Sequence, residues 1–397
     1  MSNEQNVYIV AAKRSAVTKG KRGGFAKKRP DDLLADILKQ TVKASGVNPE
    51  DIGDVVIGCA MPEGEQGMNV ARISTLLAGL PDSVPAFTIN RYCSSGLQSI
   101  AIAANEIAQG NMEVAVAGGV ESMSMIPFGG HNISFSSDIF TKDENVAIAY
   151  GMGITAENVA KDWNISREMQ DEFSLKSHQK AMHAIENGYF NDEIIPVNVH
   201  HRKSDESRGE IVDKEQMIQI DEGARKDTSL EALAKLKPAF AEGGSVTAGN
   251  SSQVSDGAGA VVLVSEAYLK KHHLKPLGKF LGFAVAGVPA RVMGIGPVKA
   301  IPKVLKQTNL QLKDIDWIEL NEAFAAQSLA VINELKLDEN KVNPFGGAIA
   351  LGHPLGATGA VLTVKALHGL RRTGKKYGMI TMCIGAGMGA AGIIEAC

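Results

Sequence analysis

The chain has 397 residues, of which 44% are hydrophobic and 21% are charged. This composition excludes a disordered chain and supplies enough apolar material for two or three units of ordinary domain size. The 41 Lys and Arg residues nearly balance the 44 Asp and Glu residues, and the net charge of −3 gives no general attraction for nucleic acid or an anionic membrane.

The cysteine pattern points to a reducing compartment. The four cysteines, Cys59, Cys93, Cys383 and Cys397, form no Cys-x-x-Cys pair, which argues against a disulfide framework or a zinc site. A strand-like run at residues 7–12 begins almost at once and leaves no room for a cleavable leader, and no apolar run is long enough to span a bilayer. We therefore expect a cytoplasmic protein with no metal site.

Short apolar runs alternate with helical patterns along the chain. The expected strands are residues 7–12, 55–58, 86–90, 114–118 and 259–264, and the expected helices are residues 33–45, 96–109 and 155–163. Such alternation is typical of a largely parallel α/β layering.

The order of these segments repeats weakly. The sequence Leu-Lys-Gln-Thr occurs at residues 38–41 and again at 305–308, and an apolar run that begins with Asp-Ile follows each copy, at 51–57 and 314–318. A glycine-bounded segment, a helix and a small apolar strand ending in glycine come next in both places. This matched order indicates duplication of one α/β unit.

The stretch between the two copies has a different character. Residues 121–249 hold most of the histidines, a charge-rich helical pattern at 167–188 and a polar loop at 200–205. We interpret this stretch as an insertion lying over the core, of a kind that often carries ligand-binding surface.

Cys93 stands between an apolar strand-like run and an amphipathic helical pattern that begins at Leu97. A cysteine at a strand-to-helix junction faces free backbone N–H groups and the positive end of the helix dipole, and both stabilise a thiolate. Cys93 is thus a candidate nucleophile with an acidic thiol, and a buried inert cysteine is the alternative.

His353 lies in the tripeptide Gly352-His353-Pro354, inside a glycine-rich apolar segment at residues 343–359. A neutral imidazole in such a poorly hydrated bend can take a proton from a thiol or donate a hydrogen bond to an oxyanion. A lone histidine is more often structural, but the rigid flanks favour a placed catalytic group.

Cys383 ends an apolar strand and leads into the glycine turn that begins at Gly385. The glycines allow a backbone N–H to point at a reacting carbonyl oxygen. A dinucleotide-binding G-x-G-x-x-A motif is the competing interpretation, and it fails because too few residues follow to build a βαβ unit.

Asn321 follows the apolar pair Trp317-Ile318 and is predicted to open a helix. A helix N-cap is the simpler interpretation of this residue. The two roles are compatible, because an amide at the end of a strand can also orient a water.

In this order, the segments around Cys93, Asn321, His353 and Cys383 resemble the thiolase family, and more specifically the 3-ketoacyl-CoA thiolases, over nearly the whole chain. The resemblance implies an α/β fold of two duplicated five-stranded halves, stacked as α-β-α-β-α layers, with an inserted loop domain.

The same resemblance implies domain boundaries. Residues 1–120 plus 250–272 would form the N-terminal half, residues 121–249 the inserted loop domain, and residues 273–397 the C-terminal half.

The resemblance also implies an acyltransferase that cleaves 3-ketoacyl-CoA with coenzyme A in fatty acid β-oxidation, through an acyl-Cys93 intermediate. His353 would activate Cys93, and Cys383 would protonate the departing acetyl-CoA carbanion. One oxyanion site would be His353 with a water held by Asn321, and the other would be the backbone N–H groups of Cys93 and Gly385. No metal or bound cofactor is required, since coenzyme A is a substrate.

Four further positions match the family's substrate-binding residues. Ser252 matches a residue that contacts the pantetheine chain, Arg225 a basic residue beside the adenosine end, and Met152 and Phe324 apolar pocket residues. A solvated arginine is the alternative interpretation of Arg225.

Two features depart from the short-chain acetoacetyl-CoA thiolases, and a basic segment is a separate departure. Residues 93–96 read Cys-Ser-Ser-Gly where those enzymes usually have Cys-Gly-Ser-Gly, and Gly151 stands where they often place a histidine. Both differences favour the broad degradative branch, and Gly151 leaves more room for a long acyl chain.

Between Lys13 and Arg29 there are eight Lys or Arg residues and no acidic residue, which indicates a solvated loop or attraction of coenzyme A.

Other readings of the family resemblance remain. An acetyl-CoA acetyltransferase, which condenses two acetyl-CoA into acetoacetyl-CoA, shares every catalytic residue, whereas a ketoacyl synthase needs a second histidine that is missing. A non-catalytic thiolase-like lipid carrier predicts loss of Cys93, His353 or Cys383. The family forms homodimers, some of which pair into tetramers, so the expected partners are acyl-CoA, CoA and further copies of the chain, without nucleic acid or membrane.

Overall fold

The computed structural model describes residues 5–205 and 209–397. The strands are β1 (Val7–Arg14), β2 (Thr18–Lys19), β3 (Asp54–Gly58), β4 (Ala86–Ile89), β5 (Val114–Ser122), β6 (Val197–Asp205), β7 (Glu210–Ile218), β8 (Ser255–Ser265), β9 (Gly278–Gly287), β10 (Trp317–Leu320), β11 (Tyr377–Ile384) and β12 (Met388–Ala396). The α-helices are α1 (Pro30–Ser45), α2 (Val70–Leu77), α3 (Ser95–Ala108), α4 (Asp143–Val146), α5 (Met152–Asp162), α6 (Arg167–Glu186), α7 (Leu230–Ala234), α8 (Glu266–Lys271), α9 (Gly296–Thr308), α10 (Ala325–Leu335), α11 (Ala348–Leu351) and α12 (Leu355–Thr373).

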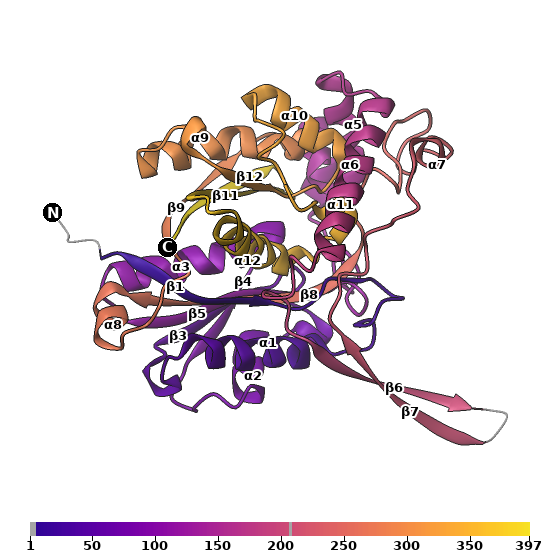
Figure 1. The fold of residues 1–397 in the computed structure, drawn as a ribbon. Helices are drawn as coiled ribbons and strands as arrows, with labels where there is room; N and C mark the ends of the chain where they lie inside the picture. Colours follow the sequence, from indigo (N-terminus) through magenta and orange to yellow (C-terminus); the bar gives the residue numbers. More distant parts are fainter. Residues whose placement is uncertain (1–4, 206–208) are drawn as a thin grey trace.

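The body of the molecule is a stack of five layers (Figure 1). Helices α1 and α2 cover the outer face of the half-sheet made of β1, β3, β4, β5 and β8, and helix α9 covers the outer face of the half-sheet made of β9 to β12. Helices α3 and α12 pack against each other between the two half-sheets. This is the expected α-β-α-β-α arrangement.

Both half-sheets repeat one pairing scheme. In the first, β4, β3 and β5 are parallel, and β8 and β1 continue the sheet antiparallel. In the second, β10 and β11 are parallel, and β12 and β9 continue antiparallel. A single parallel bridge from Ile318 to Val342 takes the place of β4, and β1 pairs with β9 to join the halves. The repeated pairing confirms duplication of one α/β unit.

The expectation of a largely parallel sheet is wrong. Among the described residues, three of the nine strand pairings in the large sheet are parallel and six are antiparallel. The difference arises because β8 and β12 each run against both of their neighbours. Apolar alternation in the sequence identifies a buried strand but contains no information on its direction.

The eight expected elements all form, within a few residues of their predicted ends. Helix α1 begins with Pro30 at its first position, has Asp31 and Asp32 in its first turn, and ends at Gly46, whose φ of 72° closes the helix. Strands β5 and β8 are buried along their whole length, because helices cover both of their faces. Their unbroken runs of small apolar residues therefore fit a central strand.

Two glycines let the central helices approach closely. A Cβ at Gly119 would lie 2.2 Å from the carbonyl oxygen of Gly356, and a Cβ at Gly359 would lie 2.2 Å from the backbone nitrogen of Leu97. Helix α12 therefore packs directly on β5 and α3. This contact brings the segment before α12 next to the segment before α3, and these segments contain His353 and Cys93.

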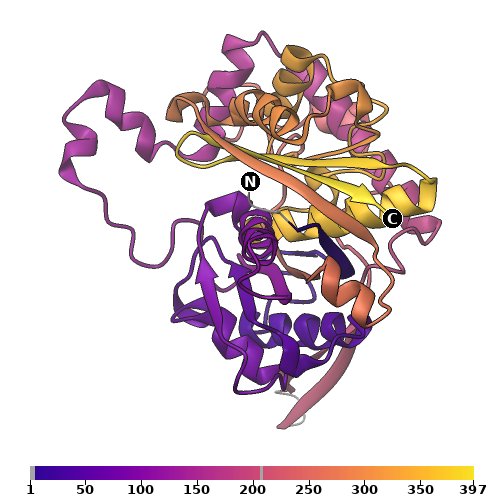
Figure 2. The same ribbon diagram turned by 90° about the vertical axis from the view of Figure 1, so that its left-hand side faces the viewer.

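The inserted region packs on one end of the stack. Helices α5 and α6 contact α10, and α6 also contacts α11 (Figure 1). The two-stranded sheet of β6 and β7 extends away from the body. Figure 2 shows the segment after β5, which carries α4, looping out beside the two halves. In the described residues, no helix combines the length and apolar character needed to cross a membrane.

The basic segment from Lys13 to Arg29 is only partly a solvated loop. The side chain of Arg14 is 1% exposed and forms ion pairs with Glu193 at 2.7 Å and with Asp221 at 2.8 Å. Arg14 therefore fastens the end of β1 to the inserted region, and the interpretation as surface loop is wrong for this residue. Its buried carboxylate partners lie about 200 positions away, which no local charge count can reveal.

Candidate active site

Cys93 lies in a tight turn between β4 and α3. The turn is a short 3₁₀ segment (Tyr92–Ser94) in which Tyr92 has a φ of 44°, a conformation that non-glycine residues rarely adopt. The Ser95 hydroxyl stabilises the turn, because it donates to the Tyr92 carbonyl at 2.7 Å and accepts from the Arg91 N–H at 2.8 Å. The predicted strand-to-helix junction at Cys93 is confirmed.

The turn that carries Cys93 packs against β11, which carries Cys383. The backbone N–H of Gly385 donates to the Cys93 sulfur, and negative charge on Cys93 raises the pKa of Cys383. Cys93 packs with Ala60, Met123 and Leu355 and is 8% exposed, and Cys383 is fully buried. The turn before α3 and the C-terminal end of β11 therefore bring Cys93 and Cys383 to the same part of the molecule.

The expectation of an acidic Cys93 thiol is wrong. Burial raises the pKa of Cys93 to about 11 and outweighs the Gly385 N–H, which favours the thiolate. Burial also raises the pKa of Cys383, and it lowers the pKa of His353 to about 4. The resting site holds two neutral thiols and a neutral imidazole at pH 7.

These pKa values predict how Cys93 reacts with iodoacetamide. A thiol is protonated at pH values below its pKa. As long as the pH stays below about 11, each increase of one pH unit therefore raises the thiolate fraction of Cys93 about tenfold. We expect the alkylation rate to climb steadily from pH 6 to pH 9, measured by peptide mapping in a Cys397→Ser background that removes the exposed cysteine. A plateau already reached at pH 7 would indicate a thiolate–imidazolium pair and contradict this description.

His353 and Asn321 form a second buried pair. The Asn321 amide nitrogen lies 3.3 Å from His353 Nε2, and both side chains are at most 4% exposed. Asn321 follows β10 and its backbone N–H donates to the Thr381 carbonyl on β11, two residues before Cys383. The Oδ1 atom of Asn321 is buried and has no hydrogen-bond partner in the described part of the protein. An orphaned buried oxygen of this kind is a binding position for water or substrate.

The prediction that Asn321 opens a helix is wrong. Helix α10 begins at Ala325 with Phe324 at its N-cap, so Asn321 lies in the connection before it. The amide of Asn321 is thus not used in capping and is free to face His353.

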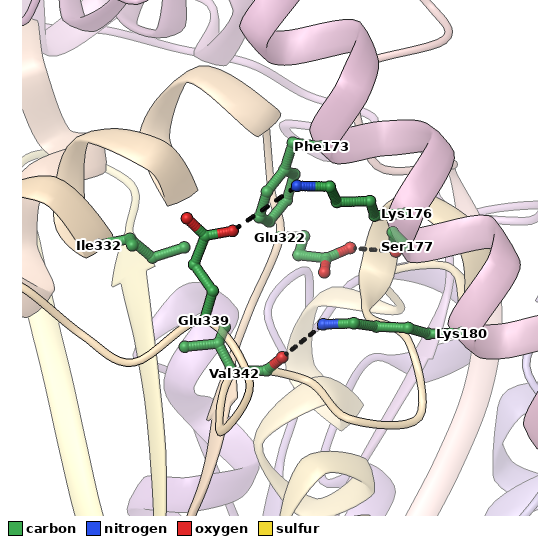
Figure 3. A pocket seen from close by; sticks show the side chains of 8 residues that line it. All are labelled: Phe173, Lys176, Ser177, Lys180, Glu322, Ile332, Glu339 and Val342. Atoms are coloured by element: carbon green, nitrogen blue, oxygen red, sulfur yellow. Dashed lines mark hydrogen bonds and ion pairs between the residues drawn. The ribbon is translucent and has the colours of Figure 1, made fainter. Parts of the chain in front are cut away.

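The segment before His353 is held by a buried carboxylate, Glu322. Figure 3 shows its side chain directed at Ser177. Glu322 accepts from the Ser177 hydroxyl at 2.6 Å, from the Asn343 amide at 2.8 Å and from the Ile349 backbone N–H at 3.2 Å. A Cβ at Gly347 would lie 2.1 Å from its carboxyl carbon, so only glycine fits there. Glu322 is adjacent to Asn321 and holds α11, which lies just before His353. It therefore fixes the position of Asn321 relative to His353.

We expect Glu322→Gln to lower turnover by about 10- to 100-fold, because the amide cannot accept all three hydrogen bonds and a displacement of about 1 Å is enough for such a loss. Glu339→Gln is the matched control, since Glu339 lines the same cavity but its side chain is 60% exposed (Figure 3). Steady-state rates together with thermal melting would separate misplacement from unfolding. Equal rates for the two variants would show that Glu322 does not position the loop.

A second buried carboxylate, Glu121, lies behind Cys93. It accepts from the backbone N–H of Ala60 and of Gly356, each at 2.7 Å, and from the side chain of Gln66. Glu121 thereby joins the segment after β3 to the first turn of α12. Its negative charge also contributes to the raised pKa of Cys93.

Three of the four predicted substrate-binding residues lie near Cys383. Met152 and Phe324 belong to the same buried apolar cluster as Cys383, and a Cβ at Gly385 would lie 3.8 Å from the Met152 sulfur. Ser252 is half-buried and its backbone N–H donates to the Ala323 carbonyl at 2.9 Å.

Arg225 lies apart from this cluster, with an exposed side chain. Its backbone N–H donates to His178 Nδ1 at 3.1 Å, and nearby Gly223 packs against the carbonyl of Ala350 in α11. The structure thus places Arg225 on the surface beside α11, outside the apolar cluster.

The described residues contain no group of three or more His, Cys, Asp or Glu side chains that could hold a metal ion. The donor set at the site is two thiols, one imidazole, one amide and backbone N–H groups, which suits acyl transfer and proton transfer.

Comparison with known proteins agrees with this geometry. The chain matches the family "Thiolase, N-terminal domain" over residues 7–267 and the family "Thiolase, C-terminal domain" over residues 274–396. The chain belongs to the thiolase family. A thiolase from Bacillus subtilis named 3-ketoacyl-CoA thiolase is 51% identical over 99% of this chain and 100% of its own length. The human peroxisomal 3-ketoacyl-CoA thiolase is 44% identical over 98% of this chain and 91% of its own length.

Solved thiolase structures share the fold over the whole chain. The acetyl-CoA acetyltransferase of Bacillus anthracis and the human mitochondrial 3-ketoacyl-CoA thiolase each have a TM-score of 0.89 and 41% identity, with full coverage of both chains. The names of these two structures differ, but both are equally similar to this chain. The fold alone therefore does not indicate which of the two named activities this chain has.

Three polar residues of the thiolase site are not evident as site residues from the sequence pattern. Glu121 is an acid directly after an apolar run, which is a signal for a satisfied buried carboxylate, whereas Glu322 stands beside Asn321 and Glu319 and carries no such signal. Thr358, which contacts the His353 ring, stands five positions after it in the first turn of α12. Its role depends on a ring orientation that spacing does not reveal.

Proposed function

We propose that this thiolase cleaves 3-ketoacyl-CoA with coenzyme A to give acetyl-CoA and a shortened acyl-CoA, in fatty acid β-oxidation. The observation that carries the proposal is the packing of the Cys93 turn against the strand that carries Cys383, beside the buried His353–Asn321 pair. The Gly385 N–H also favours the Cys93 thiolate. Acyl transfer needs one group that attacks a carbonyl carbon and another that exchanges a proton with the neighbouring carbon. Relatives named 3-ketoacyl-CoA thiolase over nearly the full chain support the same reaction.

The first half-reaction begins with proton transfer from Cys93 to His353 Nε2. The sulfur electron pair then forms a bond to the 3-keto carbon of the substrate, and the carbonyl electron pair moves to oxygen. The backbone N–H groups of Cys93 and Gly385 stabilise this oxyanion. A neutral thiol and a neutral base are the right starting pair, because a preformed thiolate is not needed when proton transfer accompanies attack.

Collapse of this adduct breaks the bond between carbons 2 and 3. The electron pair moves into the acetyl-CoA fragment as an enolate, whose carbon takes the proton of Cys383. The new N–H of His353, and a water held by Asn321, stabilise the enolate oxygen. The unpartnered Oδ1 of Asn321 supports a water in that position. Acetyl-CoA leaves, and the acyl group stays on Cys93.

The second half-reaction returns both protons. The Cys383 thiolate takes the thiol proton of coenzyme A, and the coenzyme A sulfur attacks the acyl carbon on Cys93. The Cys93 sulfur leaves and recovers its proton from His353. Condensation of two acyl-CoA molecules is the same sequence in reverse, with the Cys383 thiolate as base.

We propose that the site accepts a long acyl chain beside Gly151. Gly151 is exposed, precedes Met152, and a Cβ added to it would have no atom within 4 Å. We propose that Met152 and Phe324 line the acyl path, that Ser252 contacts the pantetheine chain, and that exposed Arg225 binds the anionic adenosine end of coenzyme A.

A thiolysis assay across chain lengths tests this proposal. We expect 3-ketodecanoyl-CoA to be cleaved with a kcat/KM at least equal to that of acetoacetyl-CoA. Gly151→His should lower the kcat/KM for the longer substrate by about tenfold more than for the shorter one, because one misfitted pocket group costs about 1–3 kcal/mol. Strict preference of the unaltered chain for acetoacetyl-CoA would instead favour an acetyl-CoA acetyltransferase.

That alternative is supported by the B. anthracis structure, which carries the name acetyl-CoA acetyltransferase. The non-catalytic lipid carrier is disfavoured, because Cys93, His353 and Cys383 are all present. No metal or bound cofactor enters the proposed mechanism, in which coenzyme A acts only as a substrate.

We further propose a homodimer, with a homotetramer as the other possibility. Strand β4 is an edge of the large sheet in the described structure, and Met68 beside it is 96% exposed, with Leu77 and Phe87 also exposed. An unpaired edge flanked by apolar side chains favours pairing with a second copy.

Three further expectations stay predictions. They are a cytoplasmic location, the absence of nucleic-acid or membrane partners, and the division into residues 1–120 plus 250–272, 121–249 and 273–397.

A further inference from the structure

Both ring nitrogens of His353 have a neighbour. Nδ1 lies 2.6 Å from the Thr358 hydroxyl oxygen, and Nε2 lies 3.3 Å from the Asn321 amide nitrogen. Thr358 is 2% exposed and lies in the first turn of α12, directly after the loop that carries His353. The ring is thus held from two sides: by Thr358 in helix α12, which follows His353 in the chain, and by Asn321, which follows strand β10.

The Thr358 hydroxyl has a single hydrogen, and that hydrogen has a partner. The oxygen lies 2.9 Å from the carbonyl of Pro354, which accepts it. The remaining lone pairs of the hydroxyl face His353 Nδ1, so the bond at 2.6 Å runs from Nδ1–H to Thr358. A neutral imidazole has one N–H, so Nε2 then carries the ring's lone pair, and the Asn321 amide nitrogen 3.3 Å away faces it as a donor.

We propose that Thr358 is a positioning residue for the acyl transfer: it holds His353 as the Nδ1–H tautomer, whose Nε2 lone pair takes the thiol proton of Cys93. This inference rests on the proposed function for its consequence, but the tautomer itself is a property of the resting protein. The Cys93 S–H bond breaks, an N–H bond forms at Nε2, and the sulfur electron pair is freed for attack. The same new N–H is then available to the enolate oxygen.

The other tautomer would fail at this step. An Nε2–H cannot accept the thiol proton, and it would set two N–H donors against each other in the contact between His353 and Asn321. The Thr358 hydroxyl therefore selects the productive form without touching the substrate.

Thr358→Val and Thr358→Ser test the proposal, because valine keeps the shape without the hydroxyl and serine keeps the hydroxyl. Nitrogen-15 NMR of histidine-labelled protein, assigned with His353→Asn, reports the tautomer in the absence of substrate. Rapid-mixing measurement of Cys93 acylation by acetyl-CoA reports its consequence.

We expect the unaltered protein and Thr358→Ser to hold His353 with the proton on Nδ1. Thr358→Val should lose this preference and acylate Cys93 about 100-fold more slowly, with the substrate concentration for half-maximal rate changed by less than about twofold. A proton on Nε2 in the unaltered protein would overturn the proposal even if Thr358→Val fails to fold, and so would a folded Thr358→Val that acylates at the normal rate. Failure of the unaltered protein to acylate at all would contradict the proposed function, and the NMR result would still decide the tautomer.

Discussion

Replacing Cys93 with alanine is expected to reduce thiolysis by at least about 10⁴-fold, because no other group can carry the acyl intermediate. Cys93 is nearly buried in a turn stabilised by Ser95, and removal of its sulfur leaves those backbone hydrogen bonds in place. Binding of acyl-CoA should therefore persist while turnover is lost. The measurement is the steady-state rate with a 3-ketoacyl-CoA substrate, beside a binding titration with a non-cleavable acyl-CoA analogue.

Cys59→Ala is the matched control for that variant. Cys59 is fully buried at the end of the segment held by Glu121, and its thiol lies 3.9 Å from that carboxylate. The Cys59→Ala variant removes a sulfur atom that is buried like that of Cys93 but has no proposed role with Cys383. A Cys93→Ala protein as active as Cys59→Ala would contradict the covalent mechanism.

Replacing Cys383 with alanine is expected to separate the two kinds of chemistry. Cleavage of the carbon–carbon bond should fall by about 10³-fold, because the departing enolate loses its proton donor. Acylation of Cys93 by acetyl-CoA should slow, because the departing coenzyme A sulfur loses the Cys383 proton, but it should remain measurable, since His353 and the N–H groups of Cys93 and Gly385 are unchanged. Thiolysis is followed by loss of 3-ketoacyl-CoA, and acylation by rapid quench and mass spectrometry.

The control for Cys383→Ala is the melting temperature, because Cys383 is fully buried on β11. A folded variant that keeps normal thiolysis would exclude Cys383 as the proton donor. A folded variant that loses acylation as well would show that the two sulfur atoms do not have separate roles.

The sequence predicts those features of the fold that depend on local pattern. The strands, the duplication and the junction at Cys93 follow from apolar runs, a matched order of segments and a strand-to-helix transition. The directions of β8 and β12 do not follow, because both neighbours of each strand come from distant segments. The buried ion pairs of Arg14 cannot be predicted from the sequence pattern for the same reason, because their partners are distant in the chain.

The sequence indicates which residue types to consider at the site but not their electrostatics. The helix dipole and free N–H groups beside Cys93 indicate an acidic thiol, yet the surrounding Met123 and Leu355 exclude water and raise its pKa instead. Likewise, an asparagine after a strand indicates a helix cap, whereas the cap is Phe324 and the amide faces His353. Both errors arise because tertiary neighbours outweigh local tendencies.

The central claim is that an acyl group is carried on the Cys93 sulfur. The most direct test is to mix Cys383→Ala with isotopically labelled acetyl-CoA, quench in acid, and map the label by mass spectrometry. The mechanism predicts label on the peptide that contains Cys93, attached as a thioester and released on addition of free coenzyme A. Label on any other residue, or a folded protein that acquires no label, would contradict the mechanism.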